Sequence, residues 1–374
     1  MNKELIVMVT NIPNQYRIPL FNELHLQLER KGMSLHVIFG AIGYQRRSTK
    51  IDLTDCQFSY EILPSGWLRN IEYKTGFMFY CGLKHALQRL KPARIIVAGY
   101  SFATIKLWAK SWWSDVKYYI WSGSIARKGK EHSSLRIFQR KLLIRRAQGF
   151  IAYGSLAKKN FELFGADPSK VIAVGNTVDT IYFEKETQRM TQLQSDSKRK
   201  HLTYVGYLTP RKNVRLLIEV VYELSLIRND FVFDIVGDGE CREELEKLAL
   251  SLNLGDKIFF HGFQQKQELP KYLAKSNCFL FQTDFDIWGL VLNEAMAAGV
   301  PCLASTNAGA TEDLIIEGVT GFKVNFENTL AIVEKVNWVL NQPEEMKKIG
   351  STAKTFIGSN YSLSKCAENM ISIF

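Results

Sequence analysis

Short apolar runs alternate along the whole chain with longer stretches in which apolar residues recur at helical spacing. The stretches 18–30, 77–90 and 133–147 predict amphipathic helices, and a final set of helices is predicted from about residue 327 onward. Strands that alternate with helices form βαβ units and therefore parallel sheets. The predicted strands are Leu5–Thr10, Leu35–Phe39, Arg94–Ala98, Val116–Ile120, Gly149–Ala152, Val171–Val174, Leu202–Val205, Phe231–Val236, Lys257–Phe260, Cys278–Phe281 and Pro301–Ala304.

The alternation is interrupted at residues 179–200, a polar stretch without clear periodicity. We predict an interdomain linker there, between an N-terminal domain of residues 1–178 and a C-terminal domain of residues 201–355. The fold class is therefore α/β, with two Rossmann-like, doubly wound parallel sheets. Such an arrangement places a ligand in a cleft between the domains, facing the carboxyl ends of the strands.

The composition is that of an ordinary soluble globular protein. Of 374 residues, 46% are apolar and 23% charged, and no apolar run approaches the roughly 20 residues needed to span a bilayer. The N-terminal MNKELIVMVT is expected to be a first strand and not a signal peptide. The six cysteines form neither a CxxC motif nor a Cys/His cluster, which favours buried thiols in a reducing compartment over disulfides or zinc.

Positive charge is concentrated in the first half of the chain. Residues 1–190 carry 29 Lys and Arg against 14 Asp and Glu, whereas the remainder carries 19 against 23. One interpretation is chance variation in surface composition. The other is that the first half faces something anionic, such as a membrane surface or a lipid-phosphate substrate. Nucleic acid is a weaker candidate because no recognition-helix, zinc-finger or RNP-like pattern is present.

The segment DFDIWGLVLNEAMAAGVPCLAS, residues 284–305, combines two carboxylates with a glycine at the predicted start of a helix. The free N–H groups at such a start, at Gly289 and Leu290, can hold a diphosphate. Glu294 then lies on the early turns, where a carboxylate can accept two hydrogen bonds from the diol of a ribose. Asp286 is the second carboxylate of the segment.

A second motif, YVGYLTPRKNVRLLIEVV, residues 204–221, predicts a strand, a turn and a helix that starts near Pro210. Arg211 and Lys212 lie beside that start. Two cations there can neutralise a diphosphate and stabilise it as a leaving group. Further along, DIVGDGE places Gly237 in the turn that follows another strand.

Together these motifs resemble glycosyltransferase family 4, a retaining group with the GT-B fold. In its signature two glutamates seven residues apart precede AMAxGxPV. Glu294 matches the ribose-binding glutamate, and Asp286 occupies the first position, which contacts the transferred sugar. Lys212 matches the lysine of the family, whereas Tyr207 stands where an arginine is usual.

Two further segments follow in the order of the family. Gly237 lies in the turn expected near the nucleotide, and AGATEDLI, residues 308–315, resembles the Gly-Gly-x-x-Glu segment, with Glu312 at its glutamate and Ala308 in place of one glycine. His261 in FFHGF is expected to be structural. The resemblance covers about residues 202–325.

The first half resembles the family only loosely. The loop NIPNQYR after the first strand replaces the usual glycine-rich loop, and we expect Asn14 to line the donor site. Trp121-Ser122-Gly123-Ser124 stands where many relatives have a histidine, so no general base is assigned. Residues 121–146 carry eight basic side chains and one acidic one, and residues 66–80 add aromatics. A core helix with a solvated rim and a membrane-docking element are equally compatible with this pattern.

The resemblance implies a retaining hexosyltransferase that moves sugar from a UDP- or GDP-sugar to a hydroxyl of a glycan or lipid-linked acceptor. Residues 1–178 would bind the acceptor, residues 201–355 the donor, and a helix over 356–374 would cross back to the first domain. No metal or other cofactor is expected, because cations and a helix terminus serve the diphosphate. A bacterial surface-polysaccharide pathway fits the basic first half, with the enzyme in the cytoplasm or on the inner face of the membrane.

Two alternatives remain open. A nucleotide-sugar epimerase of the GT-B type would convert the donor without an acceptor. A catalytically silent nucleotide-sugar-binding protein would bind without turnover, and Tyr207 and Asp286 keep this alternative open. A dehydrogenase is disfavoured because neither half has GxGxxG after its first strand.

Overall fold

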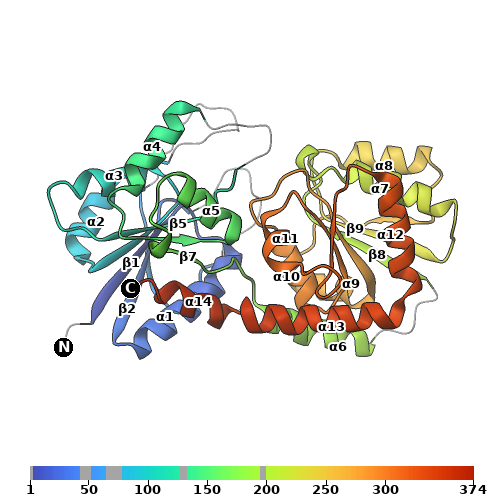
Figure 1. Ribbon diagram of the computed structural model, residues 1–374. Helices are drawn as coiled ribbons and strands as arrows, with labels where there is room; N and C mark the ends of the chain where they lie inside the picture. Colours follow the sequence, from blue (N-terminus) through green and yellow to red (C-terminus); the bar gives the residue numbers. More distant parts are fainter. Residues whose placement is uncertain (1–2, 43–51, 65–77, 127–132, 194–198) are drawn as a thin grey trace. The chain divides into compact units, whose positions relative to one another are not determined.

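The computed structural model of the chain describes residues 3–42, 52–64, 78–126, 133–193 and 199–374. The chain forms two compact units. Unit 1 consists of residues Met1–Val178 together with Leu363–Phe374, and unit 2 consists of residues Asp179–Ser362 (Figure 1). Each unit contains one parallel sheet with helices packed on it and an apolar core of its own.

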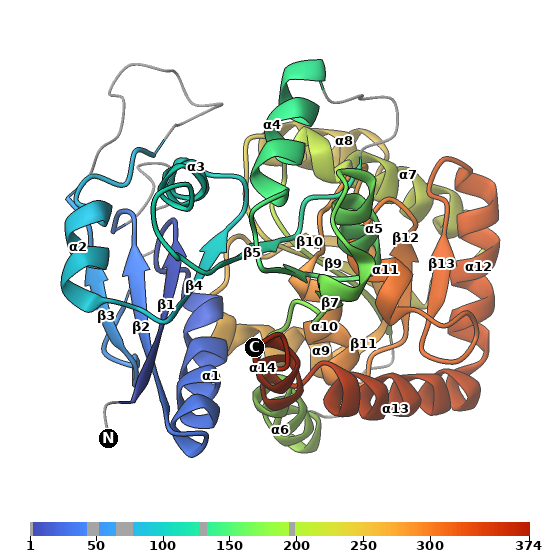
Figure 2. The same cartoon turned by 60° about the vertical axis from the view of Figure 1, so that its left-hand side comes forward.

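Unit 1 is built on a seven-stranded sheet in the order β3-β2-β1-β4-β5-β6-β7, with every neighbouring pair parallel (Figure 2). Its central strands are continuous apolar runs, as expected where both faces of a sheet are covered. The elements are β1 (Glu4–Thr10), α1 (Ile18–Arg30), β2 (Met33–Phe39), β3 (Ser59–Ile62), α2 (Leu83–Leu90), β4 (Arg94–Ala98), α3 (Phe102–Lys110), β5 (Tyr118–Ser122), α4 (Ser134–Ile144), β6 (Gly149–Ala152), α5 (Ser155–Leu163), β7 (Val171–Ala173) and α14 (Leu363–Ile371).

Unit 2 is built on a six-stranded parallel sheet in the order β10-β9-β8-β11-β12-β13. Helices α7 and α12 contact one another and share a core with β8 and β9. The elements are α6 (Thr180–Leu193), β8 (Lys200–Val205), α7 (Val214–Ser225), β9 (Phe231–Val236), α8 (Arg242–Ser251), β10 (Ile258–Phe260), α9 (Leu269–Lys275), β11 (Ser276–Phe281), α10 (Leu290–Ala297), β12 (Cys302–Ser305), α11 (Gly309–Leu314), β13 (Phe322–Val324), α12 (Thr329–Asn341) and α13 (Pro343–Asn360).

Each predicted strand is present within a few residues of its expected bounds, and two strands were not predicted. Both β3 and β13 are short edge strands, and β3 lacks a buried residue, so neither gives a clear apolar run. The helix predicted over 77–90 begins at Leu83, after Gly82 in a left-handed conformation, and residue 77 lies outside the described residues.

The linker predicted at residues 179–200 is wrong in its described part, because residues Thr180–Leu193 form helix α6. The Asp179 carboxylate accepts a hydrogen bond from the Tyr182 backbone N–H at 3.0 Å and so caps the first turn. Only Thr180, Phe183 and Thr187 are buried along the helix, which packs on α9 and α10. Two of these three residues are polar, so the buried face of α6 does not appear as a periodic pattern of apolar residues in the sequence.

The C-terminal segment changes units later than expected. Helix α13 continues through residue 356 to Asn360 within unit 2, and the boundary lies between Ser362 and Leu363. Helix α14 then packs beside α1 (Figure 1), with Cys366 and Met370 fully buried in the core of unit 1. The last helix is thus part of the hydrophobic core of the unit that begins the chain.

A buried carboxylate joins four elements of unit 2. Asp234, on β9 and 1% exposed, lies 2.7 Å from His201 Nδ1 on β8, 2.6 Å from His261 Nε2 after β10 and 3.0 Å from Lys275 Nζ at the end of α9. Burial alone would raise the pKa of Asp234, but these partners outweigh it and hold the pKa below its ordinary value. His261 therefore has a structural partner, as expected.

Asp234→Asn should lower the free energy of unfolding by about 3 kcal/mol at pH 7, because it leaves buried donors and a cation without their anion. A carboxylate with a lowered pKa in the folded state stabilises the fold above its unfolded pKa of about 3.9, and that contribution is lost as pH falls through the folded value. The difference from wild type should thus shrink below about pH 4 in urea titrations. Exposed Asp256→Asn is the control, and an equal loss of stability in both variants would contradict this account.

Candidate functional site

The two predicted cations follow β8 in a tight turn. Residues Pro210–Lys212 form a single 3-10 turn, and Asn213 is left-handed, with φ of 45°. The α-helix itself begins at Val214, four residues later than the predicted start near Pro210. Lys212 is buried, whereas the Arg211 side chain is 43% exposed.

The predicted carboxylate Asp286 lies directly on these cations. Its Oδ2 atom is 2.5 Å from Lys212 Nζ and 3.5 Å from Arg211 Nη1. Arg211 also donates to the Phe285 carbonyl and accepts from the Asp284 backbone N–H at 3.0 Å. These ion pairs and hydrogen bonds therefore link the turn after β8 to the loop after β11. One carboxylate shared by two cations leaves the cluster with a net positive charge.

Electrostatics keep the Asp286 carboxylate ionised. Burial would raise the pKa of Asp286, but Lys212 and Arg211 outweigh burial and hold it below its ordinary value. Burial lowers the pKa of Lys212, and Asp286 opposes that shift. The Lys212 ammonium also lies 5.6 Å from the centre of the Phe281 ring.

Gly289 allows the start of helix α10 to lie close to the cluster of Arg211, Lys212 and Asp286. It has φ of 105° and precedes α10, and a Cβ atom there would lie 2.2 Å from Cζ of Phe281. The Phe281 ring therefore touches both the Lys212 ammonium and the backbone at Gly289. The first N–H groups of a helix, here from Leu290 onward, have no acceptor within the helix, which makes this end a site for an anion.

Hydrogen bonds from neighbouring segments hold the loop before α10. The Asp286 backbone N–H donates to the Asn307 carbonyl at 3.2 Å, and the Gly309 N–H donates to the Asp286 carbonyl at 3.0 Å. Trp288, which is buried, donates through Nε1 to the Asn293 side chain at 2.9 Å. Sequence reasoning missed Asn307 and Trp288, although both lie beside motifs that it identified.

Glu294 is a half-buried carboxylate without a partner in the described part of the chain. It lies one turn after Leu290 on the same face of α10, and helical side chains lean toward the N-terminus of their helix. Burial raises its pKa to about 7, and the positive charge of Lys266 opposes this only in part. A carboxylate with unused acceptor capacity therefore lies close to the anion-binding end of the helix.

The remaining predicted residues are placed differently. Gly237, with φ of 149°, lets the turn after β9 pack against β8, since a Cβ atom would lie 1.8 Å from the Gly206 carbonyl oxygen. Glu312 on α11 is half-exposed and lies 3.2 Å from Lys323 Nζ. Asn14 belongs to unit 1, in the loop between β1 and α1, where its carbonyl accepts from the Arg17 N–H at 2.9 Å. The other predicted residues all belong to unit 2.

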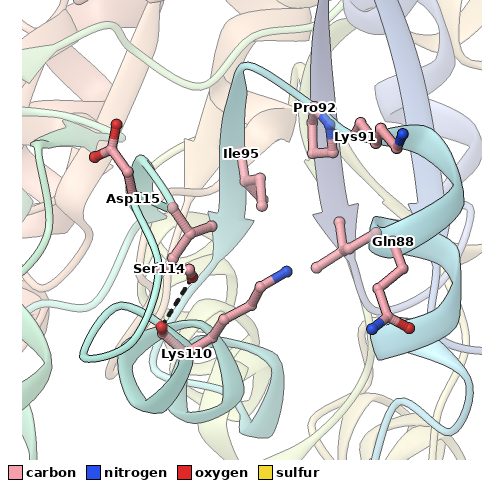
Figure 3. A pocket seen from close by; sticks show the side chains of 9 residues that line it. Gln88, Lys91, Pro92, Ile95, Lys110, Ser114 and Asp115 are labelled. Carbon is pink, nitrogen blue, oxygen red and sulfur yellow. Dashed lines mark hydrogen bonds between the residues drawn. The ribbon is translucent and has the colours of Figure 1, made fainter.

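A pocket of about 240 Å³ in unit 1 is a different feature. It lies between α2 and α3 at the amino ends of β4 and β5, and Figure 3 shows the Lys110 side chain extending into it. Ligands of open α/β sheets bind at the carboxyl ends of the strands, the opposite edge. None of the predicted site residues lines this pocket.

Within the described ranges, no group of three or more His, Cys, Asp or Glu is arranged to hold a metal ion. None of the helices in the described part of the chain is long and apolar enough to cross a membrane.

Gly289→Ala should lower the free energy of unfolding by about 1–3 kcal/mol, because an alanine at that φ is strained and its Cβ atom meets Phe281. Gly358→Ala is the matched control: it lies inside α13 with open space around it, and alanine there should stabilise the helix by up to about 1 kcal/mol. Chemical denaturation of both variants measures the difference. If Gly289→Ala leaves the free energy of unfolding unchanged, or if both variants change it by the same amount, the close approach at Gly289 is refuted.

Part of the chain matches a known protein family. Residues 185–356, slightly less than half of the chain, match the family described as Glycosyl transferases group 1. The chain is 29% identical over 171 residues to alpha-D-kanosaminyltransferase of Streptomyces kanamyceticus, covering 46% of this chain and 44% of that protein. It is 28% identical over 194 residues to the GDP-mannose-dependent alpha-(1-6)-phosphatidylinositol monomannoside mannosyltransferase of Mycolicibacterium smegmatis, covering 49% and 50%. The matches thus span about half the length of these curated relatives.

Similarity to solved structures extends over both units. The crystal structure of HepE from Anabaena in complex with UDP and glucose matches with a TM-score of 0.76 at 17% identity, covering 99% of this chain and 98% of that one. At this identity the likeness concerns the fold alone. The chain has the GT-B fold of glycosyltransferases, and its C-terminal unit carries the segment typical of glycosyl transferases group 1.

Proposed function

We propose that this chain is a retaining glycosyltransferase that moves a hexose-type sugar from a UDP- or GDP-sugar to a hydroxyl of a glycan or lipid-linked acceptor. The observation that carries the proposal is the cluster of Arg211, Lys212 and Asp286 beside the start of α10, with unpaired Glu294 one turn along that helix. A net positive cluster next to free helical N–H groups suits a diphosphate.

Each group has a proposed role. Arg211 and the Leu290 end of α10 bind the diphosphate and stabilise negative charge as the glycosidic bond breaks. Lys212 shares its charge between Asp286 and the diphosphate, and Asp286 contacts the donor sugar. Glu294 in its ionised form accepts two hydrogen bonds from the ribose diol. The bond from the anomeric carbon to the diphosphate breaks on the same face on which the acceptor hydroxyl forms its bond, and the departing diphosphate takes up the proton of that hydroxyl, which accounts for retention without a separate general base.

The relatives support a sugar nucleotide as the donor and leave its nucleobase open. The name of the mycobacterial relative specifies GDP-mannose, and the solved HepE complex holds UDP. For this chain we keep both nucleotides as candidates, with a role in bacterial surface-polysaccharide synthesis that fits the basic first half.

A thermal-shift panel of nucleotides and nucleotide sugars tests the donor site. At a ligand concentration of 100 Kd, the preferred nucleotide should stabilise the protein by about 2.7 kcal/mol. Arg211→Gln should abolish most of that shift. Arg215→Gln is the control, since this exposed arginine on α7 pairs with Glu219 and Glu244. No stabilisation by any nucleotide, or equal loss in both variants, would refute the donor site.

Glu294 gives the binding a pH dependence of known sign. Because ionised Glu294 accepts from the diol and its pKa is about 7 in the free protein, affinity for a nucleotide sugar should fall by about tenfold between pH 8 and pH 6. Glu294→Gln should bind more weakly and without this slope, as measured by calorimetry. Wild-type affinity that rises on acidification would show that the protonated form is the binding form and contradict the assignment.

Turnover separates the proposal from its alternatives. Incubation of the preferred nucleotide sugar alone should give no new sugar, whereas an epimerase would convert it. Addition of an acceptor should release the nucleoside diphosphate and give a product with the anomeric configuration of the donor by NMR. Binding without release in the presence of a broad acceptor panel would favour the silent binding protein.

We further propose that unit 1 docks on an anionic membrane surface. Trp112 and Trp113, at the end of α3, are 57% and 84% exposed, and Leu135 and Phe138 project from α4, which contacts α3. Arg136 and Lys141 are exposed on α4, and Arg145 is exposed directly after it. Interfacial tryptophans with nearby cations are typical of proteins that bind anionic lipid surfaces. The rest of the predicted basic and aromatic segments, residues 66–77 and 127–132, lies outside the described residues.

Vesicle sedimentation tests the docking. The protein should bind vesicles that contain phosphatidylglycerol and not pure phosphatidylcholine, and binding should weaken with salt. Replacing Trp113 and Phe138 together by serine should reduce binding by about tenfold or more. Leu226→Ser, an exposed apolar residue of unit 2, should change nothing. Equal binding by the double variant would reject this surface.

A further inference from the structure

Unit 1 contains an arginine enclosed by aromatic rings. The Arg17 guanidinium, between β1 and α1, lies 4.4 Å from the centre of the Trp121 ring, 5.5 Å from that of Tyr16 and 5.6 Å from that of Tyr153. It donates through Nη2 to the Tyr153 hydroxyl. Trp121 lies at the end of β5 and Tyr153 directly after β6. The group thus gathers at the carboxyl edge of the sheet, where α/β folds bind ligands.

The guanidinium has no carboxylate partner among the described residues. Burial would lower its pKa, but Tyr153 and Tyr16 raise it above the ordinary value, so it stays charged. A desolvated charge without a counterion costs several kcal/mol, and proteins retain such a charge where a ligand supplies the missing partner. Arg17, Tyr16 and Tyr153 are half-buried, so the cation lies at the rim of the unit and is not sealed inside it.

Two N–H donors in this group also lack an acceptor. Arg17 Nε and Trp121 Nε1 are both buried, and neither has a hydrogen-bond partner in the described structure. Trp121 itself is only 1% exposed. Both atoms can only donate, and an unsatisfied buried donor costs about 1–3 kcal/mol. A negatively charged group that only accepts hydrogen bonds would satisfy the cation and both unpaired donors.

A second arginine of the same unit shows the satisfied form of this arrangement. Arg146 lies 4.7 Å from the centre of the Trp112 ring, yet its Nε donates to Ser111 Oγ at 2.8 Å and its Nη2 to the Ser111 carbonyl at 2.5 Å. Stacking on tryptophan therefore does not explain why the Nε donor of Arg17 is left unpaired.

We propose that Arg17, Trp121 and Tyr153 bind an oxyanion, a carboxylate or a phosphate, carried by the acceptor substrate. The inference rests on the proposed glycosyltransferase function and specifies the acceptor class. The planar guanidinium can pair with two oxygens of either group, and the indole N–H can supply a further hydrogen bond. The acceptor is thus an acidic or phosphorylated sugar, and a neutral sugar lacks the group that this site recognises.

Titration of the full chain with small probes tests the site. The probes are methyl glucuronide for a carboxylate, glucose 1-phosphate for a phosphate and methyl glucoside as the neutral sugar, each in the presence of the saturating nucleotide so that the donor site is filled. The indole N–H resonance of Trp121, assigned through Trp121→Phe, should move with at least one anionic probe and not with methyl glucoside. The anionic probe that shifts the Trp121 resonance shows whether the recognised group is a carboxylate or a phosphate.

Matched variants give the energetic test. By calorimetry, Arg17→Lys should weaken the anionic probe by about tenfold, because lysine keeps the charge and loses the planar pair of donors. Trp121→Phe should weaken binding of the anionic probe several-fold, because it removes one donor. This variant provides the test if Arg17→Lys fails to fold. Arg146→Lys should leave the affinity unchanged, and the nucleotide-induced thermal shift, a property of unit 2, should persist in all three.

The outcomes are separable. If a nucleotide stabilises the protein but no anionic probe moves the Trp121 signal, or Arg17→Lys binds as wild type does, solvent satisfies these donors and the inference fails while the donor site stands. If methyl glucoside binds as well as the anionic probes, the site recognises sugar hydroxyls and the oxyanion assignment is overturned. If no nucleotide stabilises the protein, the proposed function fails, and the same titration without nucleotide still decides whether Arg17 binds an anion.

Discussion

The ion pair between Lys212 and Asp286 is the contact on which the candidate site depends. It joins the turn after β8 to the loop before α10 across 74 positions of sequence, and Arg211 strengthens it through the same carboxylate and the Phe285 carbonyl. Because Lys212 is buried, loss of Asp286 would leave a desolvated charge in the interior. The geometry of the cations and of the helix terminus is therefore set by one pair.

Unit 2 contains one buried carboxylate that is fully paired and another carboxylate that has no ion-pair partner among the described residues. Asp234 is buried deeply, and three partners hold it ionised inside the sheet. Glu294 is only half-buried, it has no hydrogen-bond or ion-pair partner in the described part of the chain, and the charge of Lys266 offsets its desolvation only in part. A carboxylate with a pKa near 7 and free oxygens costs the fold some stability, as groups kept for binding commonly do.

Unit 1 shows the same distinction between two arginines. Arg146 is stacked and hydrogen-bonded, whereas Arg17 is stacked with its Nε donor unpaired and a buried indole N–H unpaired beside it. Arg17 lies at the carboxyl edge of its sheet, as Lys212 does in unit 2, where the turn follows β8. The donor cluster and the aromatic arginine thus occupy equivalent edges of two similar sheets.

The sequence by itself determined the α/β class and most strands, and it singled out the residues of the candidate site. Continuous apolar runs such as Cys278–Phe281 are typical of buried strands, and their spacing leaves room for a helix between each pair. Gly289 and Glu294 were identifiable because helix starts and glycines have strong local signatures. Short edge strands and the polar core stripe of α6 escaped, because they bury too little apolar surface to leave a pattern.

Only the tertiary structure decided which charges are paired. The sequence placed Lys212 and Asp286 on separate motifs with separate roles, and the fold brought them to 2.5 Å, so that each neutralises the other. Likewise, no local pattern distinguishes Arg17 from Arg146, because distant residues make much of the environment of each guanidinium: Tyr153 lies 136 positions from Arg17, and Ser111 lies 35 positions from Arg146. Apolar periodicity is a property of consecutive residues, whereas desolvation and charge compensation depend on what the whole fold brings together.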